Sequence, residues 1–333
     1  MITRQAAGRT YNYGYCIGRI GMSGPSFFAP PDFALGSGGS LYVINKAMEM
    51  IPCHGMVKCT LDHELLWEDR GPGFGNGDCL WPSSIAVDSG ENVYVSDDYV
   101  SQIFIFDKDG NFLTQWGTKG SADGELDRPS GLAFDARDNL YVVDGLNHRV
   151  QKFTRDGEFL GGWGKEGSGE GEFNMPWGIA IDSAGDVFVA DWKNHRVQKF
   201  SPDGSYLATF GSPGAADGEM QYPTGVAIDD EGDVYVTDYG NNRLNIYAAD
   251  GTFLTAFYGD AEALARWSQD YVDSNPDLAV ARRRADLTPE GRFGSPVAVN
   301  VDGVGRIMVL ELQRARIQIY VKERNFVDAP FNL

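Results

Sequence analysis

A carboxylate recurs at a fixed spacing in this sequence, at a place where several such groups could act together. Asp97, Asp144, Asp191 and Asp238 lie 47 residues apart, each at the end of a short apolar run. Converging carboxylates could bind a calcium ion or serve as acids and bases. An aspartate that recurs in four copies is more simply explained as an acceptor of backbone N–H bonds in a turn. The spacing shows no Ser-His-Asp or Cys-His set.

The residues beside these aspartates differ between copies, as expected where recognition is built on a regular scaffold. Aromatic walls with a few charges suit a pocket for a small molecule or a peptide. The candidate ligand-binding residues are Asp97, Asp98, Tyr99, Arg128, Asp144, Trp177, Asp191, Trp192, Lys193, Tyr222, Asp238, Tyr239, Arg283 and Glu311. Tyr99, Asp191 and Lys193 are the candidates for a catalytic role.

These residues belong to a repeat of about 47 residues that fills most of the chain. Degenerate copies that start at Pro30 and Pro296 flank four clear copies, which makes six. The clear copies align without gaps, and each has a proline near its start: Pro82, Pro129, Pro176 and Pro223.

Each copy has the pattern of four short antiparallel strands. In the second clear copy, apolar and polar residues alternate around a turn at Asp156-Gly157. The strands predicted there are residues 132–134, 140–143, 150–153 and 159–163. Four strands in a repeat of this length are typical of a propeller blade. The sequence therefore predicts an all-β fold, with residues 1–333 forming one six-bladed β-propeller of four-stranded antiparallel blades.

The N-terminus is predicted to close this ring. Only a short tail follows Tyr320, whereas residues 13–21 precede the first repeat as the last strand of each blade precedes the next repeat. This segment should form the outermost strand of the last blade, which would remove a free sheet edge and tie the chain ends together.

One insertion interrupts the period. The segment from Gly211 to Pro223 spans 12 positions, whereas that from Gly259 to Pro296 spans 37. Helix-start signals predict a small helical insertion at residues 260–292, on the same face as the recurring aspartates. We expect this insertion to be a lid over the channel mouth. Its arginines, Arg282, Arg283 and Arg284, could bind an anionic ligand or pair with nearby carboxylates.

Sequence motifs in the repeats resemble a known family. The string NHRVQKF begins at Asn147 and again at Asn194, and it accompanies P-x-G-[IVL]-A and [VI]-D-x-x-G-[ND]-[VL]-[YF]-V. Together these motifs resemble the NHL repeat over nearly the whole chain. The resemblance implies the fold but not the function, because NHL-like propellers include both enzymes and binding modules.

Two related enzyme families sharpen the expectations. Peptidyl-hydroxyglycine amidating lyases hold zinc with channel histidines, one of them in a Pro-His-Ser motif. Here the residues after the prolines are Ser83, Ser130, Trp177, Thr224 and Val297. The comparison therefore implies no such zinc site, although residues 95–99 resemble the lyase segment that carries a catalytic tyrosine, which points to Tyr99. Gluconolactonase-like propellers hold calcium with central acidic ligands, so a calcium ion in the central channel stays open and no metal ligand is assigned.

Other recurring polar residues are interpreted as structural. His148 and His195 repeat with the motif, which favours a structural role over a catalytic one. The arginines next to them are expected to pair with carboxylates or carbonyls: Arg149, Arg196 and Arg243. Four aspartates at the opposite ends of the strands are expected to form turns: Asp88, Asp135, Asp182 and Asp229.

Composition limits the partners. The net charge of −19 argues against nucleic acid, including RNA, and against anionic membranes, because both need a basic surface. Cys53, His54, Cys59 and His63 lie close together but match no zinc pattern. No apolar run is long enough to span a bilayer, and the N-terminus lacks a secretory signal. A cytoplasmic protein is therefore expected if Met1 is the natural start, and the oligomeric state stays unknown.

Two functions remain after these observations. The leading hypothesis is a propeller that binds a small molecule or peptide at the channel mouth, either as a binding protein or as a lyase or hydrolase. The rival is a non-catalytic protein–protein interaction scaffold that uses the same face or the blade rims.

Overall fold

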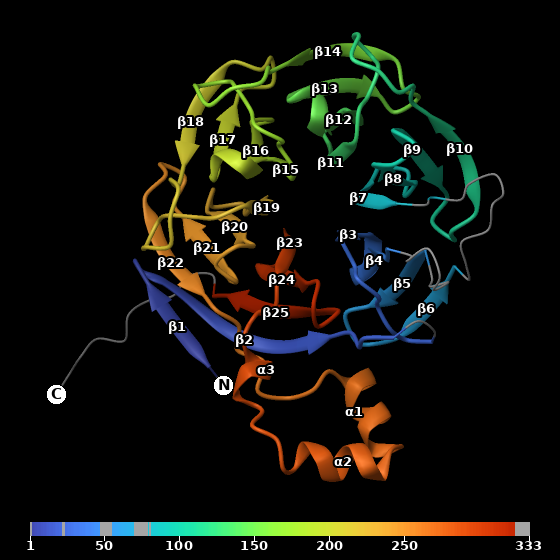
Figure 1. Cartoon of the computed structure of the whole chain (residues 1–333), viewed down its shortest axis with the longest axis vertical. Helices are drawn as coiled ribbons and strands as arrows, with labels where there is room; N and C mark the ends of the chain where they lie inside the picture. The colour runs from blue at the N-terminus through green and yellow to red at the C-terminus, as the bar shows by residue number, and fades with distance from the viewer. Residues whose placement is uncertain (1, 22–23, 47–54, 70–78, 80, 324–333) are drawn as a thin grey trace.

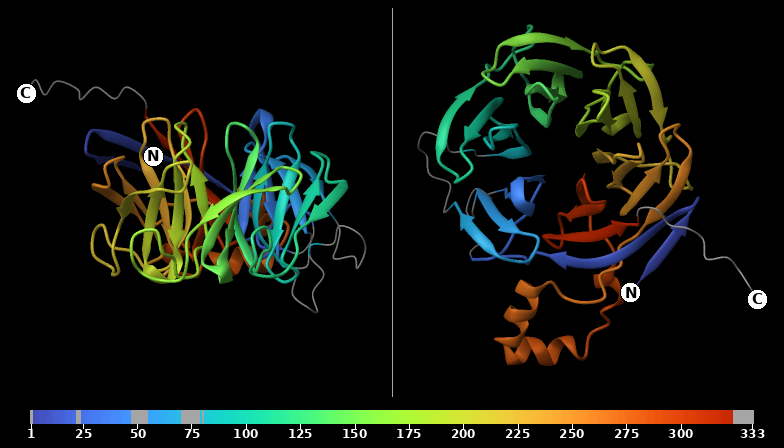
Figure 2. Two further views of the ribbon diagram at one scale, coloured as in Figure 1. Left: turned by 90° about the horizontal axis from the view of Figure 1, so that it is seen from above. Right: turned by 180° about the vertical axis from the view of Figure 1, so that it is seen from behind.

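Six small sheets form a closed ring around a central axis (Figure 1). The structure is a computed structural model that describes residues 2–21, 24–46, 55–69, 79 and 81–323. Seen from its edge, the ring is a flattened disc (Figure 2). The predicted six-bladed β-propeller is confirmed.

Each blade is an antiparallel sheet whose first strand lies nearest the axis. Blade 1 contains β3 (Asp32–Leu35), β4 (Ser40–Ile44), β5 (Met56–Thr60) and β6 (Leu65–Glu68). Blade 2 contains β7 (Pro82–Val87), β8 (Val93–Asp97), β9 (Gln102–Phe106) and β10 (Phe112–Trp116). Blade 3 contains β11 (Pro129–Phe134), β12 (Asn139–Asp144), β13 (Arg149–Thr154) and β14 (Phe159–Trp163).

The remaining blades follow the same plan. Blade 4 contains β15 (Ile179–Ile181), β16 (Val187–Asp191), β17 (Arg196–Phe200) and β18 (Tyr206–Phe210). Blade 5 contains β19 (Pro223–Ile228), β20 (Val234–Asp238), β21 (Arg243–Tyr247) and β22 (Phe253–Phe257). Blade 6 contains β23 (Pro296–Val301), β24 (Arg306–Glu311), β25 (Arg316–Lys322), β2 (Arg9–Ile17) and β1 (Thr3–Ala6). Single 3-10 turns are η1 (Ser37–Gly39), η2 (Gly145–Asn147) and η3 (Trp192–Asn194).

The hydrophobic core lies between neighbouring blades. Strand alternation directs apolar side chains to both faces of a blade, so each blade needs a neighbour on either side. Val143 and Val150 of blade 3, for example, share one buried cluster with Val189 and Phe200 of blade 4. This packing is why six imperfect copies of one repeat form a single cooperative ring rather than separate units.

The N-terminus closes the ring in blade 6, as predicted. Strand β2 pairs antiparallel with β25, with Tyr13 opposite Tyr320 and Ile17 opposite Ile317. The blue β2 therefore lies beside the red β25 in Figure 1. The strand begins and ends four residues before the predicted segment, and the additional strand β1 pairs with its outer edge.

A group of ion pairs also joins blade 6 to blade 5. It lies on the face of the disc opposite to the recurring aspartates, at the turn between β19 and β20. The Lys322 ammonium lies 2.6 Å from Asp229 and 2.7 Å from both Glu231 and Asp233. These three carboxylates are close enough together to hold a metal ion. The Lys322 ammonium already pairs with all three of them, however, and Arg9 also pairs with Asp233, so the cluster is a structural ion-pair network.

The predicted turn-forming role of the aspartates on this opposite face is confirmed. The Asp135 carboxylate accepts hydrogen bonds from the backbone N–H groups of Arg137 and Asn139, both at 2.9 Å. Equivalent bonds to backbone N–H groups are made by Asp88, Asp182 and Asp229.

The helices of the insertion do not cover the channel. The chain forms α1 (Arg266–Asp273), α2 (Pro276–Arg282) and α3 (Thr288–Gly291), and both face-on views place α1 and α2 outside the ring, beyond β2 (Figures 1 and 2). The predicted helices are present, but their predicted position over the channel mouth is wrong. No helix among the described residues is long and apolar enough to cross a membrane.

Candidate functional site

The recurring aspartates are fully buried and make structural hydrogen bonds. Asp144 accepts bonds from the Asp127 backbone N–H at 2.7 Å, from Asn147 at 2.9 Å and from Arg149 at 2.8 Å. The Arg149 guanidinium also reaches the Glu125 carbonyl, which holds the preceding loop against the blade. The structural role that was one alternative for these aspartates is therefore the one their geometry supports.

The same group of bonds recurs around the ring. It centres on Asp191 with Arg196, Asp238 with Arg243 and Glu311 with Arg316. In blade 2, Asp97 instead accepts bonds from the backbone N–H groups of Trp81 and Tyr99. Because Asp191 has no exposed surface and several bonded donors, it is badly placed to exchange a proton with a ligand.

The two motif histidines are structural, as expected. The Nδ1 atom of His148 accepts the backbone N–H of Met175 at 3.1 Å, and that of His195 accepts the N–H of Tyr222 at 3.0 Å. Each bond joins a blade to the residue before the next blade's proline. Ser101 and Asn242 occupy the same place and bond to Arg128 and Ser295.

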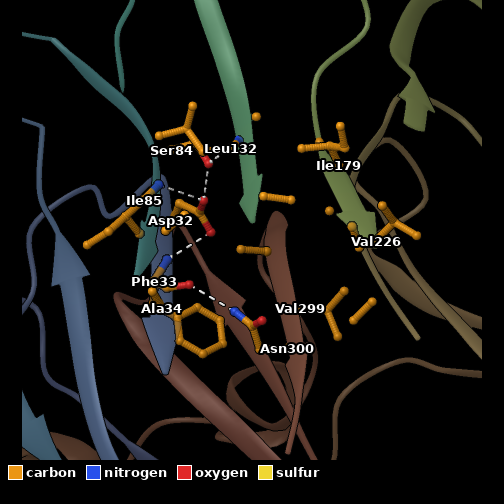
Figure 3. A pocket seen from close by; sticks show the side chains of 18 of the residues that line it. Asp32, Phe33, Ala34, Ser84, Ile85, Leu132, Ile179, Val226, Val299 and Asn300 are labelled. Carbon is orange, nitrogen blue, oxygen red and sulfur yellow. Dashed lines mark hydrogen bonds between the residues drawn. The ribbon is translucent and has the colours of Figure 1, made fainter. Parts of the chain in front are cut away.

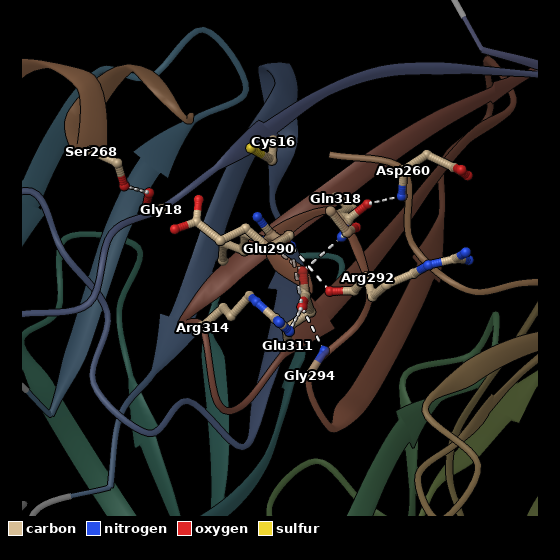
Figure 4. Close-up of polar contacts among 12 residues, drawn as sticks. Cys16, Gly18, Asp260, Ser268, Glu290, Arg292, Gly294, Glu311, Arg314 and Gln318 are labelled. Atoms are coloured by element: carbon tan, nitrogen blue, oxygen red, sulfur yellow. Dashed lines mark hydrogen bonds and ion pairs between the residues drawn. The ribbon is translucent and has the colours of Figure 1, made fainter. Parts of the chain in front are cut away.

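Part of the insertion packs against the outside of the ring, where blades 6 and 1 meet. The Trp267 indole donates to the His63 carbonyl at 2.8 Å, and Ser268 donates to the Gly18 carbonyl at 3.2 Å. Figure 4 shows Ser268 and Asp260 on either side of the bonds around Glu311. Arg283 is exposed at the C-terminal cap of α2, outside the ring, and bonds to the Ala279 carbonyl of that helix. The structure therefore does not bring Arg283 to the channel mouth.

The cysteines and histidines between residues 53 and 63 were predicted not to form a zinc site. Two of them, Cys53 and His54, lie outside the described residues. Cys59 is a free thiol with no exposed surface, buried in a hydrophobic cluster of blades 1 and 6. Burial raises the pKa of this thiol to about 12, which disfavours the thiolate form that a zinc ion needs.

Aromatic side chains gather at the mouth of the channel on blades 4 and 5. The Trp177 and Trp192 ring centroids lie 6.4 Å apart, and Trp192 lies 5.1 Å from Tyr222. The Lys193 ammonium is 5.9 Å from the centre of the Trp192 ring. Trp177 also lines the central cavity. Four predicted ligand-binding residues thus form one continuous surface, named here the aromatic wall: Trp177, Trp192, Lys193 and Tyr222.

A group of charges faces the same mouth from blades 1 to 3. Asp98 lies 3.6 Å from the Arg128 guanidinium, and Lys46 lies 5.5 Å from the centre of the Trp81 ring. Burial lowers the pKa of Lys46, and the nearby Asp98 opposes that shift. Asp98 and Arg128 were predicted, whereas Lys46 was not. Tyr99 is largely exposed beside them, and Tyr239 is half-buried on blade 5.

Below the mouth, the first strands of all six blades enclose a cavity of about 320 Å³. Figure 3 shows Asp32 of blade 1 reaching toward blade 2 within this cavity. The Asp32 carboxylate accepts hydrogen bonds from the Ser84 hydroxyl at 2.6 Å, the Ile85 backbone N–H at 3.2 Å and the Phe33 backbone N–H at 2.8 Å. Among the residues that line this cavity, Asp32 is the one ionisable side chain.

The residues directly after the blade prolines are the positions where an amidating lyase would carry its zinc-binding histidine. In this protein, Ser83 and Ser130 at two of these positions form hydrogen bonds between blades. The Ser83 hydroxyl donates to the Pro129 carbonyl at 2.8 Å, and the Ser130 hydroxyl donates to the Pro176 carbonyl at 3.2 Å. Each of these side chains links the first strand of its blade to the next blade.

Asp32 was missed because its repeat is degenerate. Strand pairing places Asp32 directly before Phe33 in β3. The equivalent position is occupied by Ser84 in blade 2 and by Gly131 in blade 3. The sequence signal was an aspartate at a position that is small or hydroxylated in the clear copies. Counting two residues on from Pro30, as Ser84 lies two residues after Pro82, already leads to Asp32.

The pKa of Asp32 is raised from 3.8 to about 6, mainly because burial deep in the ring desolvates the carboxylate, and partly opposed by its three donors. The folded protein therefore binds a proton that the unfolded chain releases near pH 4, and ionisation at higher pH destabilises the fold. We expect wild-type stability to fall by about 1 kcal/mol, relative to the Asp32→Ser variant, between about pH 5 and pH 7.

Urea unfolding of both proteins at the two pH values measures this difference. Serine is the matched replacement because Ser84 occupies the equivalent position in blade 2. Parallel pH profiles for the two proteins would contradict the raised pKa of Asp32.

Comparisons with known proteins support the fold. The family model of the NHL repeat matches residues 126–153, 173–200 and 220–247, so the chain contains NHL repeats. No curated protein matches this sequence significantly.

Solved structures resemble the chain more broadly. A protein of unknown function from Bacteroides thetaiotaomicron has a TM-score of 0.64 at 16% identity, over 95% of this chain and 76% of its own. A streptogramin B lyase has a TM-score of 0.58 at 12% identity, over 96% of this chain and 100% of its own. A catalytically inactive virginiamycin B lyase from Staphylococcus aureus with quinupristin has a TM-score of 0.54 at 14% identity, over 88% of this chain and 94% of its own. At these identities the likeness shows the fold alone.

Proposed function

We propose that this NHL-repeat propeller binds a small molecule or peptide with an aromatic group at its channel mouth. The observation that carries the proposal is the aromatic wall, in which Trp177 continues from the cavity lining to Trp192 and Tyr222. A ligand ring stacked on this surface would bury apolar area and gain favourable ring–ring geometry.

The wall is not required to build a blade. Where blade 4 has Trp177 and Trp192, blade 3 has Ser130 and Gly145 and still forms a four-stranded sheet with the same aspartate–arginine bond. Large, partly exposed aromatic side chains that the fold does not need favour a role in recognition.

A lyase or hydrolase reaction is the finer form of this proposal. The names of the neighbouring streptogramin B and virginiamycin B lyases favour it. Of the predicted catalytic residues, Lys193 and Tyr99 are accessible to a ligand at the mouth, whereas Asp191 is enclosed. Any such reaction would therefore use Lys193, Tyr99 or the cavity carboxylate Asp32 rather than Asp191.

An interaction scaffold is the second candidate, and one observation favours it. A leucine about half exposed recurs on the outer strand of four consecutive blades. These residues are Leu66, Leu113, Leu160 and Leu207. A protein that docks along the rim would cover them, and its binding would survive changes to the aromatic wall.

The proposal is tested by replacing Trp192 with alanine. Saturation-transfer NMR with N-acetylphenylalanine amide, a neutral peptide-like aromatic probe, should show ring contacts with the wild-type protein. Losing one stacking partner should weaken binding about threefold to tenfold.

Tyr271→Ala is the control, because Tyr271 is an accessible aromatic residue, about half exposed, that lies on α1, outside the ring. It should bind the probe as the wild type does. Absence of probe binding at about 10 mM, a concentration that detects very weak complexes, or full binding by Trp192→Ala would overturn the proposal.

A further inference from the structure

Asp32 occupies one of six equivalent positions around the channel. The strand registers align Asp32 with Ser84 and Ala298, and with a glycine in each of blades 3 to 5. The glycines are required by close packing: a Cβ atom on Gly178 would lie 2.0 Å from the Thr224 carbonyl oxygen. The ring at this level is therefore built from small residues, with one carboxylate among them.

Joining blades 1 and 2 does not require a carboxylate. In blade 2 the Ser84 hydroxyl accepts the Leu132 backbone N–H of blade 3 at 3.2 Å, just as Asp32 accepts the Ile85 N–H of blade 2. A neutral hydroxyl thus makes the same bridge from the equivalent position, and a serine at position 32 would avoid burying a charge. The negative charge at Asp32 is an addition to the structural role.

No cation of the protein compensates that charge. Among the described residues, none of the ion pairs involves Asp32, and no other titratable side chain faces it from the six strands that line the cavity. Its three donors are neutral groups: two backbone N–H groups and the Ser84 hydroxyl. When it is ionised, the Asp32 carboxylate therefore has a negative charge that a cation in the cavity could compensate.

The nearby side chains favour an ammonium group. The Ser84 hydroxyl is already used, because it donates to Asp32 and accepts from Leu132. The Asn300 amide donates to the Phe33 carbonyl at 2.9 Å, which leaves its oxygen as an acceptor. An ammonium carries several N–H donors, which suits a carboxylate, an amide oxygen and the carbonyls along the strand edges.

We propose that Asp32 binds the protonated amine of a ligand whose aromatic ring lies on the aromatic wall. The inference rests on the proposed function, since it extends the same site downward into the cavity. Trp177 joins the two parts, because it lines the cavity and also contacts Trp192, and an indole ring itself attracts an organic cation. The ligand class is therefore an aromatic amine or a peptide with an aromatic N-terminal region.

Three probes with one phenyl ring and different end groups test this inference: phenethylamine, phenethyl alcohol and hydrocinnamate. They are titrated by ligand-observed NMR into EDTA-treated protein at about pH 7, where Asp32 is mainly ionised. The amine should bind about tenfold more tightly than the alcohol, as expected for a hydrogen bond between charged groups. Its affinity should fall about fivefold at pH 5 as Asp32 becomes protonated, while that of the alcohol stays constant.

The matched variant is Asp32→Ser, which keeps a side-chain acceptor at this position as blade 2 does. A circular-dichroism melt verifies its fold. It should bind the amine and the alcohol equally, and Asp32→Asn should do the same. An amine no tighter than the alcohol, or an amine preference that survives both substitutions, would overturn the inference.

The same experiment separates this inference from the proposed function. If all three probes bind equally and Trp192→Ala weakens each of them, the aromatic wall is a binding site and the role of Asp32 is refuted. If none of the probes binds, nor N-acetylphenylalanine amide, both proposals fail.

Discussion

Deleting residues 1–21 will leave a propeller that does not fold stably. The deletion removes β1 and β2, and with them the side chains of Tyr11, Cys16 and Ile17, each at most 3% exposed. Burial of such side chains contributes about 1.5–3 kcal/mol apiece, and the exposed edge of β25 also loses its backbone partners. The total of about 5–10 kcal/mol is comparable with the whole stability of a typical domain.

Thermal unfolding followed by circular dichroism, together with gel filtration, measures this loss. Deletion of residues 1–7 is the matched control, because it removes only β1, whose side chains are exposed or half-buried. That control should lose about 1 kcal/mol, in part from the ion pair between Arg4 and Asp260. An unchanged melting temperature in the longer deletion would show that β2 is not needed to close the ring.

Replacing Arg243 with methionine will destabilise the protein by about 3–5 kcal/mol, the cost of leaving a buried charge without its partner. The Arg243 side chain is 2% exposed and bonds to Asp238 at 2.8 Å. It also donates to the Ala216 carbonyl at 2.9 Å and the Glu219 carbonyl at 2.6 Å. Methionine keeps the volume but leaves Asp238 and both carbonyls without these donors.

Urea unfolding measures the change, and two variants make the test specific. Arg155→Met should change stability by less than about 0.5 kcal/mol, because Arg155 is half exposed and its 3.8 Å contact with Asp138 is screened by water. The double variant Asp238→Asn with Arg243→Met should lose less than the sum of its single changes. A loss below about 1 kcal/mol for Arg243→Met would show that the recurring aspartate–arginine bonds are not what holds the loops to the blades.

The error about the insertion has a physical origin. Chain connectivity correctly placed residues 260–292 between the last strand of blade 5 and the first strand of blade 6. A loop of this length can turn inward or outward, and nothing in its local sequence decides between them. The contacts that decide are tertiary: Trp267 packs edge-on against Phe27 at 5.7 Å, and Ala261 and Ala265 pack against Cys16.

The sequence by itself determined the repeat, the strand order and the ring closure. Alternation of side chains, turn glycines and a constant period are local properties, and six copies leave few ways to bury the two apolar faces of each blade. The residues of the aromatic wall could also be selected from the sequence, since Trp177 and Trp192 stand where blade 3 has Ser130 and Gly145.

Only the tertiary structure decided which polar residues are available to a ligand. Asp191 and Asp32 are both aspartates in propeller strands, yet one is enclosed by an arginine, an asparagine and a backbone N–H, and the other touches the central cavity with no cationic partner among the described residues. That difference depends on groups far apart in the sequence, because Asp32 meets Ser84 and Ile85 from the next blade and the Asn300 amide meets the adjacent Phe33 carbonyl. Burial and charge compensation are properties of the closed ring, so no single repeat could reveal them.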